Sequence, residues 1–97
     1  MMDDLTGFQR DILYVTAGLN DDSGPPHGLA IKDELSKSYA GEINHGRLYP
    51  NLTTLTDMGL LEMGKIDDRT NSYSLTQRGE RELKARHEWE QQYVSFE

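Results

Sequence analysis

The stretch from Asn44 to Leu61 places the strongest constraint on the fold, because it specifies one helix together with both of its ends. Asn44 is a favourable N-terminal cap, and Gly59 can adopt the left-handed backbone conformation that ends a helix. Between them, three leucines recur at i, i+4 and i+7 and therefore share one helical face: Leu48, Leu52 and Leu55. The stretch predicts a helix that buries this leucine face.

The rest of this helix is polar, and its side chains are of the types that contact base edges and phosphates in a DNA major groove: His45, Arg47, Tyr49, Asn51 and Thr54. We refer to it as the reading helix. Arg47 is expected to contact guanine, and Asn51 is expected to contact adenine or a phosphate. The ring of Tyr49 is expected to be buried, because Tyr49 adjoins the leucine face. An ordinary amphipathic helix with a solvated polar face is the alternative.

The charge of the chain argues at first against a nucleic-acid partner, since the formal net charge is −7 and DNA is a dense polyanion. The charges are unevenly distributed, however. Residues 1–43 hold eight acids and three basic residues (net −5), residues 44–87 hold six and seven (net +1), and residues 88–97 hold three acids alone (net −3). The region with the reading helix is the only one that is not acidic.

An acidic chain with only four lysines suits a cell that works in molar salt. In molar salt the screening length falls to about 3 Å, so acidic surfaces no longer repel DNA at a distance. The composition therefore indicates a halophilic archaeal source. An acidic interaction module from a mesophile would have the same net charge.

Two further helices are predicted before the reading helix. Apolar residues spaced three and four apart predict the first over residues 6–19, where Thr6 and Gln9 form a capping box. A loop with glycine and prolines follows up to His27, which is expected to be solvated. The second helix is expected over residues 28–39. Its inward-facing residues are expected to be Leu29, Ile31 and Leu35.

Basic side chains outside the reading helix lie on the second helix and on a predicted hairpin. Residues 60–66 and 72–75 predict two short strands around a polar turn. Lys65 near the base of this hairpin and Arg69 near its tip are expected to contact the DNA backbone or the minor groove. Lys32 is a further candidate for a phosphate contact. The alternative is that Arg69 and Lys32 are solvated surface charges beside neighbouring acids.

A final helix is expected to begin at Thr76 and to run to near the C-terminus. It carries more apolar area than one helix can bury against a single small domain. A second copy is the expected partner, with this helix packing on the first and last helices of the other subunit across a two-fold axis. The residues expected at the interface are Leu5, Phe8, Leu83, Trp89, Tyr93 and Phe96. The alternative is a tail that folds back on its own core.

Three runs of this sequence resemble the PadR family of winged-helix repressors: Gly46–Leu52, Gly59–Leu61 and Tyr73–Gly79. The resemblance extends from about Asp11 to Lys84. It implies an α+β, mostly α fold, a winged helix-turn-helix with a C-terminal dimerisation helix. Residues 1–79 would form the winged-helix DNA-binding domain and residues 76–97 the dimerisation helix. It also implies that residues 42–43 form a brief strand that joins the hairpin, called the wing.

The resemblance implies a sequence-specific transcriptional regulator, a repressor, that acts as a homodimer on double-stranded DNA. Two reading helices related by a two-fold axis would require a near-palindromic operator with half-sites about one helical turn apart. In some small members an aromatic residue of the last helix stacks on flat apolar compounds, and Trp89 lies in the comparable helix. A small aromatic effector near Trp89 is therefore one expectation, and a dimer anchor is the other.

An acidic winged-helix module that binds proteins of a transcription assembly is the alternative function. An enzyme is not expected, because no nucleophile triad or phosphate-binding glycine loop is present. No cofactor or metal site is expected, since the chain has no cysteine and its histidines are far apart. No apolar run is long enough to span a membrane, and the acidic start at Asp3 and Asp4 is unlike a signal peptide. A cytoplasmic protein is expected.

Overall fold

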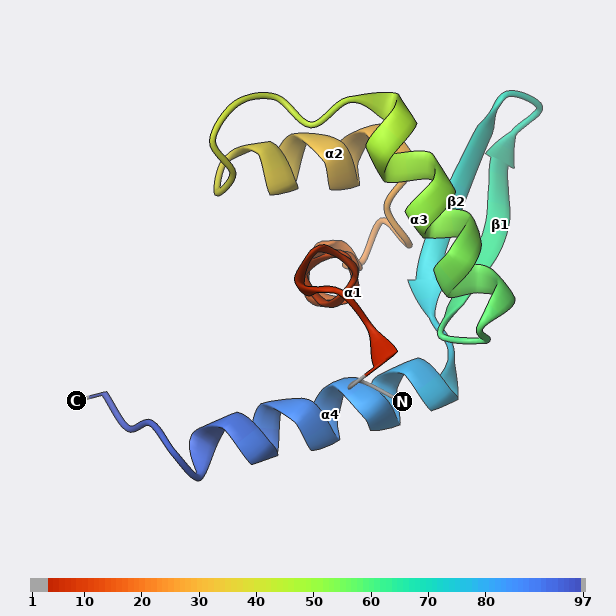
Figure 1. The fold of residues 1–97 in the computed structure, drawn as a ribbon. Coiled ribbons are helices and arrows are strands. Elements are labelled where there is room, and N and C mark those ends of the chain that lie inside the picture. The colour runs from red at the N-terminus through yellow and green to blue at the C-terminus, as the bar shows by residue number, and fades with distance from the viewer. Residues whose placement is uncertain (1–3, 97) are drawn as a thin grey trace.

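The computed structural model describes residues 4–96, so Asp3 of the acidic start lies outside the described residues. Within this range the chain forms four helices and one two-stranded antiparallel sheet, in the order α1 (Gly7–Leu19), α2 (Gly28–Ser36), α3 (His45–Asp57), β1 (Leu61–Asp67), β2 (Thr70–Leu75) and α4 (Gln77–Gln91) (Figure 1). The predicted α+β, mostly α winged helix is confirmed.

Three of the helices begin at the predicted caps. The Thr6 hydroxyl accepts a hydrogen bond from the Gln9 amide, and the Gln9 side chain accepts one from the Thr6 amide, which completes the capping box of α1. Asn44 caps α3 by accepting from the Arg47 amide at 2.8 Å. Thr76 caps α4. Gly59, just after α3, has φ +75°, as the predicted left-handed helix end requires.

The core lies where α1, α2 and α3 meet the base of the sheet. The leucine face of the reading helix is fully buried there, as predicted. Leu29, however, was predicted to face inward and is 46% exposed, so its prediction was wrong. Helix α2 also ends earlier than predicted, at Ser36 and not at Tyr39. Tyr39 follows in a turn, and its ring packs against the core.

The wing is the hairpin of β1 and β2, with Leu61 paired to Leu75 at its base and Asp67 to Thr70 beside its turn. Residues 42–43 do not form the expected third strand. Ile43 instead buries its side chain in the core. The hairpin receives its extra support from the segment before α2: the Tyr73 amide donates to the Pro26 carbonyl at 2.9 Å, and His27 forms an isolated bridge with Ser72.

Helix α4 starts beside the base of the wing and runs past α1, and its C-terminal half extends away from the body of the molecule (Figure 1). Four apolar side chains near the end of α4 and in the residues after it are exposed to solvent: Trp89, Tyr93, Val94 and Phe96. Among the described residues, no helix combines the length and the apolar character needed to span a membrane.

Candidate nucleic-acid interface

The first turn of α3 and the turn of the wing lie at the same end of the molecule (Figure 1). Because the leucine face fixes the rotation of α3, the opposite face of the helix is turned to solvent. His45, Arg47 and Thr54 are exposed on α3, and Lys65 and Arg69 are exposed on the wing. Five of the eight side chains predicted to contact DNA therefore lie on accessible surface of two adjacent elements.

Arg47 is exposed, but its guanidinium packs against two aromatic rings of the same chain. The guanidinium carbon sits 4.0 Å from the centroid of the Phe8 ring and 5.4 Å from that of Tyr39. The two rings meet edge to face, with their centroids 5.6 Å apart. The Tyr39 hydroxyl donates to an Asp11 carboxylate oxygen at 2.5 Å. Burial and this acidic partner raise the pKa of Tyr39, so the hydroxyl stays neutral and acts as a donor.

Asn51 is half-buried and is bonded within the protein on both sides of its carboxamide. Its Oδ1 accepts from Gln9 Nε2 of α1 at 2.9 Å, and its Nδ2 donates to the Arg47 carbonyl at 2.7 Å. Sequence reasoning identified Gln9 as a capping residue only. No local pattern signals the bond to Asn51, because the two residues are 42 positions apart.

The ring of Tyr49 was predicted to be buried. The structure shows the residue half-buried. Its ring stacks on His45 with the centroids 5.3 Å apart. Gly28 also lies beside it. A Cβ at position 28 would come 2.6 Å from the Tyr49 hydroxyl oxygen, so a larger side chain there would require the Tyr49 side chain to shift. Thr54 is exposed, and its hydroxyl donates back to the Pro50 carbonyl at 3.0 Å.

A cleft of about 300 Å³ separates the start of α3 from the wing. Its lining includes the side chains of His27, His45, Tyr49, Arg69 and Asn71. His27 was expected to be solvated in a loop, and it is instead half-buried at the start of α2. The lining includes basic groups and no carboxylate.

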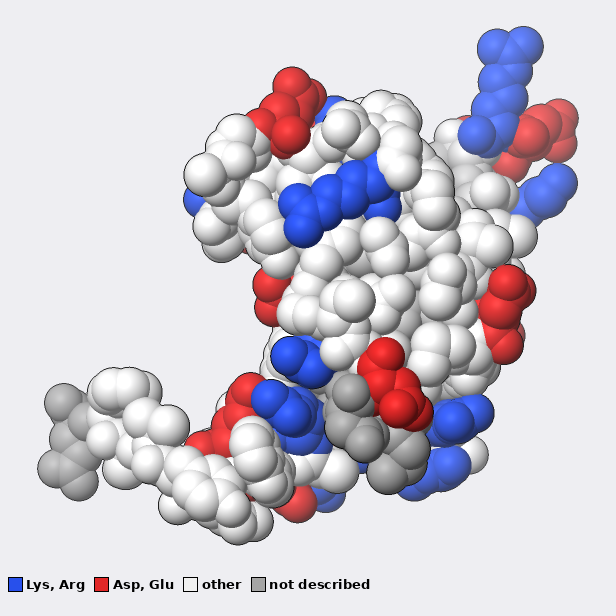
Figure 2. Space-filling model, viewed as in Figure 1, with Lys and Arg blue, Asp and Glu red and all other residues white. Residues whose placement is uncertain are grey.

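The wing turn itself carries mixed charge. The Asp67 carboxylate accepts from the Arg69 amide at 2.9 Å, and backbone and side-chain hydrogen bonds of this kind lower the pKa of Asp67. Asp67 therefore stays ionised and holds the turn, while the Arg69 side chain is exposed. Figure 2 shows Lys and Arg side chains at the wing turn, with acidic side chains directly beside them.

Lys32 occupies a different position from the one expected of a phosphate contact. It is buried, and its Nζ lies 2.8 Å from a carboxylate oxygen of Glu42. This hydrogen bond raises the pKa of Lys32 and lowers that of Glu42. Lys32 thus ties α2 to the segment before the reading helix, and a contact with DNA would require it to leave an internal partner.

Three of the six residues expected at a dimer interface lie inside the subunit. Leu5, Phe8 and Leu83 are 6%, 8% and 9% exposed and belong to the core of the single chain, which leaves them little surface for a partner. The other three lie on α4 and the residues after it, and they are 46%, 69% and 91% exposed: Trp89, Tyr93 and Phe96. Of the residues expected at the interface, those that expose apolar surface to a partner therefore lie at the C-terminal end.

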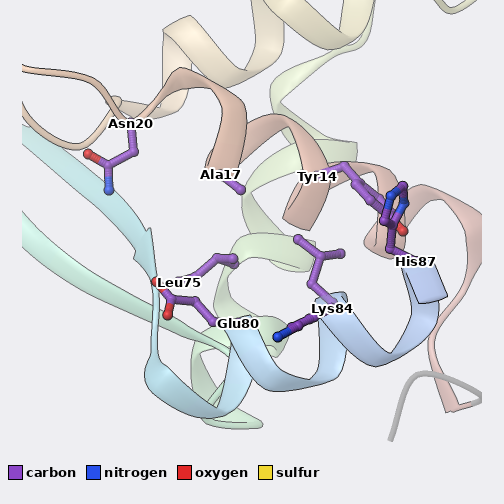
Figure 3. A pocket seen from close by; sticks show the side chains of 8 residues that line it. Tyr14, Ala17, Asn20, Leu75, Glu80, Lys84 and His87 are labelled. Atoms are coloured by element: carbon purple, nitrogen blue, oxygen red, sulfur yellow. The ribbon is translucent and has the colours of Figure 1, made fainter.

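Two hollows lie along α4. One, of about 440 Å³, lies between α1 and α4, with Tyr14 and Ala17 on one side and Lys84 and His87 on the other (Figure 3). The buried Tyr14 hydroxyl has no hydrogen-bond partner in the part of the chain that the structure describes. The second hollow, of about 410 Å³, is lined by residues 87–96, including Trp89. Over residues 4–96, no group of His, Asp and Glu side chains is arranged to hold a metal ion.

Comparisons with known proteins agree with this fold. The Transcriptional regulator PadR-like family matches residues 18–85 of the chain. The solved structure of RosR from H. salinarum, grown from NaBr, is 42% identical over 100% of this chain and 84% of its own, with a TM-score of 0.84. The complex structure of hsRosR-SG gives 41% identity over 100% of this chain and 82% of its own, with a TM-score of 0.88.

More distant structures share the fold. Bacillus subtilis PadR in complex with operator DNA is 24% identical over 95% of this chain and 52% of its own, with a TM-score of 0.64. A search of curated proteins found no match. The family match confirms the expectation of a transcriptional regulator and not an enzyme. With a family match over most of its length and a close structural relative, this chain belongs to the PadR-like family of transcriptional regulators.

Proposed function

We propose that the protein binds a near-palindromic operator as a homodimer and represses transcription from it. The observation that carries the proposal is the exposure of His45 and Arg47 in the first turn of α3, which lies at the same end of the molecule as the wing turn with its exposed Arg69. In a winged helix, such a pair of elements enters a major groove and contacts the adjacent backbone or minor groove. The same fold is found in Bacillus subtilis PadR in complex with operator DNA, which supports the proposal.

Within this interface, Arg47 is the proposed guanine contact and Asn51 the proposed contact to adenine or a phosphate. His45, Tyr49 and Thr54 contribute backbone or base contacts along the same helix. Lys65 and Arg69 position the wing on the backbone or in the minor groove. Lys32 is left out of this set, because its ammonium group already has a partner in Glu42.

The dimer forms through the exposed apolar end of α4, around Trp89, Tyr93 and Phe96. We assign residues 1–79 to DNA binding and residues 76–97 to this contact. The two-fold axis would place the two copies of α3 in successive major grooves about 34 to 36 Å apart. The relative from H. salinarum supports a halophilic archaeal source, and a cytoplasmic regulator fits that proposal. In molar salt, direct base contacts must supply more of the affinity, because the counterion-release contribution is largely lost.

Selection of bound duplexes from a random pool, at low and at molar KCl, tests the proposal. A recovered near-palindrome with half-sites about one turn apart is the expected result. The variant Arg47→Ala should bind it more weakly by about 1 to 3 kcal/mol and lose preference at one base position per half-site. A pool without enrichment, together with capture of a protein partner, would support the alternative of an acidic winged-helix interaction module.

A small aromatic effector near Trp89 is a second proposal, favoured by the two hollows beside α4. A flat apolar compound stacked on the indole ring would change its fluorescence and the coupling between the two subunits. Titration of the protein with a panel of aromatic compounds tests this. Unchanged Trp89 fluorescence in a protein that remains dimeric would leave Trp89 with the role of a dimer anchor.

A further inference from the structure

The N-terminal part of α1 contacts both residues proposed to read bases. Gln9 Nε2 donates to Asn51 Oδ1 at 2.9 Å, and the Phe8 ring lies 4.0 Å below the Arg47 guanidinium carbon. These two residues are adjacent in α1, and both partners lie in the first two turns of α3. One turn of a helix outside the helix-turn-helix therefore touches the side chains on which base recognition is proposed to depend.

The two hydrogen bonds of Asn51 fix the orientation of its carboxamide. An Asn side chain has two N–H donors and two acceptor lone pairs. Gln9 takes one lone pair of Oδ1, and the Arg47 carbonyl takes one N–H of Nδ2. One N–H and one lone pair remain, which is the pair of groups that an adenine N7 and N6 edge requires. A rotated carboxamide would present the wrong atoms to both protein partners.

The Arg47 guanidinium lies over the Phe8 ring, with its carbon 4.0 Å from the ring centroid. A ring stacked on a guanidinium contacts the flat face, so the in-plane N–H groups remain available for a two-pronged bond to guanine. The Phe8 ring is itself fixed by the edge-to-face contact with Tyr39, whose hydroxyl is bonded to Asp11. The stacking reduces the number of conformations that Arg47 must give up on binding DNA.

We infer that Gln9 is a positioning residue for sequence recognition: it sets the orientation of the Asn51 carboxamide, beside the Phe8 ring that seats Arg47. This inference rests on the proposed DNA-binding function. Gln9 itself does not touch DNA. Its contribution should therefore appear as discrimination between bases at the position that Asn51 reads, and not as general affinity for DNA.

The variant Gln9→Glu separates this role from the structural role of Gln9. A Glu at this position still accepts from the Thr6 amide and so preserves the capping box. It has no N–H group to donate, and it turns a carboxylate oxygen toward Asn51 Oδ1. The added negative charge weakens binding to all duplexes alike, so it cancels in the ratio of affinities for two sequences.

We expect Gln9→Glu to lower discrimination at one base pair of each half-site by about tenfold, measured as the ratio of Kd values for the selected operator and its single-base variants. Discrimination at the base pair read by Arg47 should remain. Thr6→Ala is the matched control, because it removes the cap and leaves the bond between Gln9 and Asn51. It should keep the wild-type base preferences.

The variant Asn51→Ala completes the cycle, since without the carboxamide Gln9 has nothing to orient. In that background Gln9→Glu should cause no further loss of discrimination. Base preferences unchanged by Gln9→Glu but altered by Asn51→Ala would overturn the positioning role and leave the proposed function intact. A wild-type protein that shows no preference among duplexes would overturn the proposed function and this inference with it.

Discussion

At Gly79, in the first turn of α4, the chain passes close to the backbone of Leu60. A Cβ at this position would lie 2.2 Å from the Leu60 carbonyl oxygen, which is backbone and cannot rotate away. We expect Gly79→Ala to lower the free energy of unfolding by about 1 to 3 kcal/mol, because α4 must shift away from the base of the wing. Urea denaturation at fixed KCl concentration measures the change.

Gly18 provides the matched control for that substitution. It is also helical, but it is exposed, and a Cβ there meets no atom within 4 Å. Gly18→Ala should raise the free energy of unfolding by about 0.4 to 1 kcal/mol, since alanine loses less conformational freedom on folding. Equal effects of the two substitutions would contradict the steric argument at Gly79.

The pair of Lys32 and Glu42 predicts a dependence of stability on pH. Lys32 lowers the pKa of Glu42 in the folded protein, so the pair stabilises the fold above the unfolded pKa of about 4.3 and this contribution is lost as the pH falls further. Glu42→Gln should lower the Tm at neutral pH and flatten the acid limb of the stability profile. Thermal unfolding, followed by circular dichroism between about pH 3 and pH 8, measures both effects.

The variant Lys32→Met is the control for this pair. Glu42→Gln removes the carboxylate charge beside a buried ammonium group, whereas methionine at position 32 fills the same space without a charge. Lys32→Met should therefore lower the neutral Tm less than Glu42→Gln does. The reverse order would show that the burial of Lys32 carries no electrostatic cost.

At this scale, the contacts that sequence predicts are those between near neighbours. The caps at Thr6 and Asn44 were predictable because their partners are three residues away. The bond from Gln9 to Asn51 and the ion pair of Lys32 were not, since each joins separate elements whose packing no local pattern specifies. The candidate site was therefore predicted by residue type, while the internal partners of its side chains were not.

At the scale of elements, the wing makes a prediction that concerns salt. Arg69 is exposed at its tip, where it is proposed to neutralise one phosphate. Arg69→Ala should reduce the slope of log Kd against log salt by about one and weaken binding to all duplexes similarly. Fluorescence anisotropy over a series of KCl concentrations measures this slope.

Arg81 on α4 is the matched control for the wing. It is also exposed, but its helix begins at the base of the hairpin, away from the turn. Arg81→Ala should leave the slope unchanged. The same loss of slope for both variants would mean that net charge, and not the position of the wing, determines the effect.

The elements themselves were predictable where the sequence carries a strong period or a cap, as in α1 and α3. The expected strand at residues 42–43 failed for a physical reason: Ile43 gains more from burial in the core than from pairing at the edge of a short sheet. Leu29 shows the limit of periodicity on α2. The residues just before α2 pair with the wing through His27 and Ser72. Leu29, at the start of α2, remains outside the core.

At the scale of the whole molecule, the exposed apolar end of α4 predicts the oligomeric state. Trp89 is 46% exposed and lies among other exposed apolar side chains. Trp89→Glu would place a charge in the proposed contact between subunits and should convert the dimer into a monomer. Light scattering coupled to gel filtration in molar KCl measures the mass. Operator affinity should fall with it, because each half-site would then be bound separately.

Leu29→Glu is the control, since Leu29 is also 46% exposed but lies on α2, away from α4. This variant should remain dimeric. A wild-type protein that is monomeric at micromolar concentration in molar salt would contradict the proposed two-fold arrangement. The overall charge could not have decided this question, because an acidic surface is compatible with a monomer or a dimer.

The backbone link between β2 and the segment before α2 has a mechanical consequence. The bridge of His27 with Ser72, which includes the hydrogen bond from the Tyr73 amide to the Pro26 carbonyl, anchors the middle of β2 to the beginning of α2. The lower half of the hairpin cannot swing without breaking this link. Only the part of the hairpin between Ser72 and the turn is free to bend. Duplexes of different groove width must be accommodated there, while the gap between α3 and the base of the hairpin stays rigid.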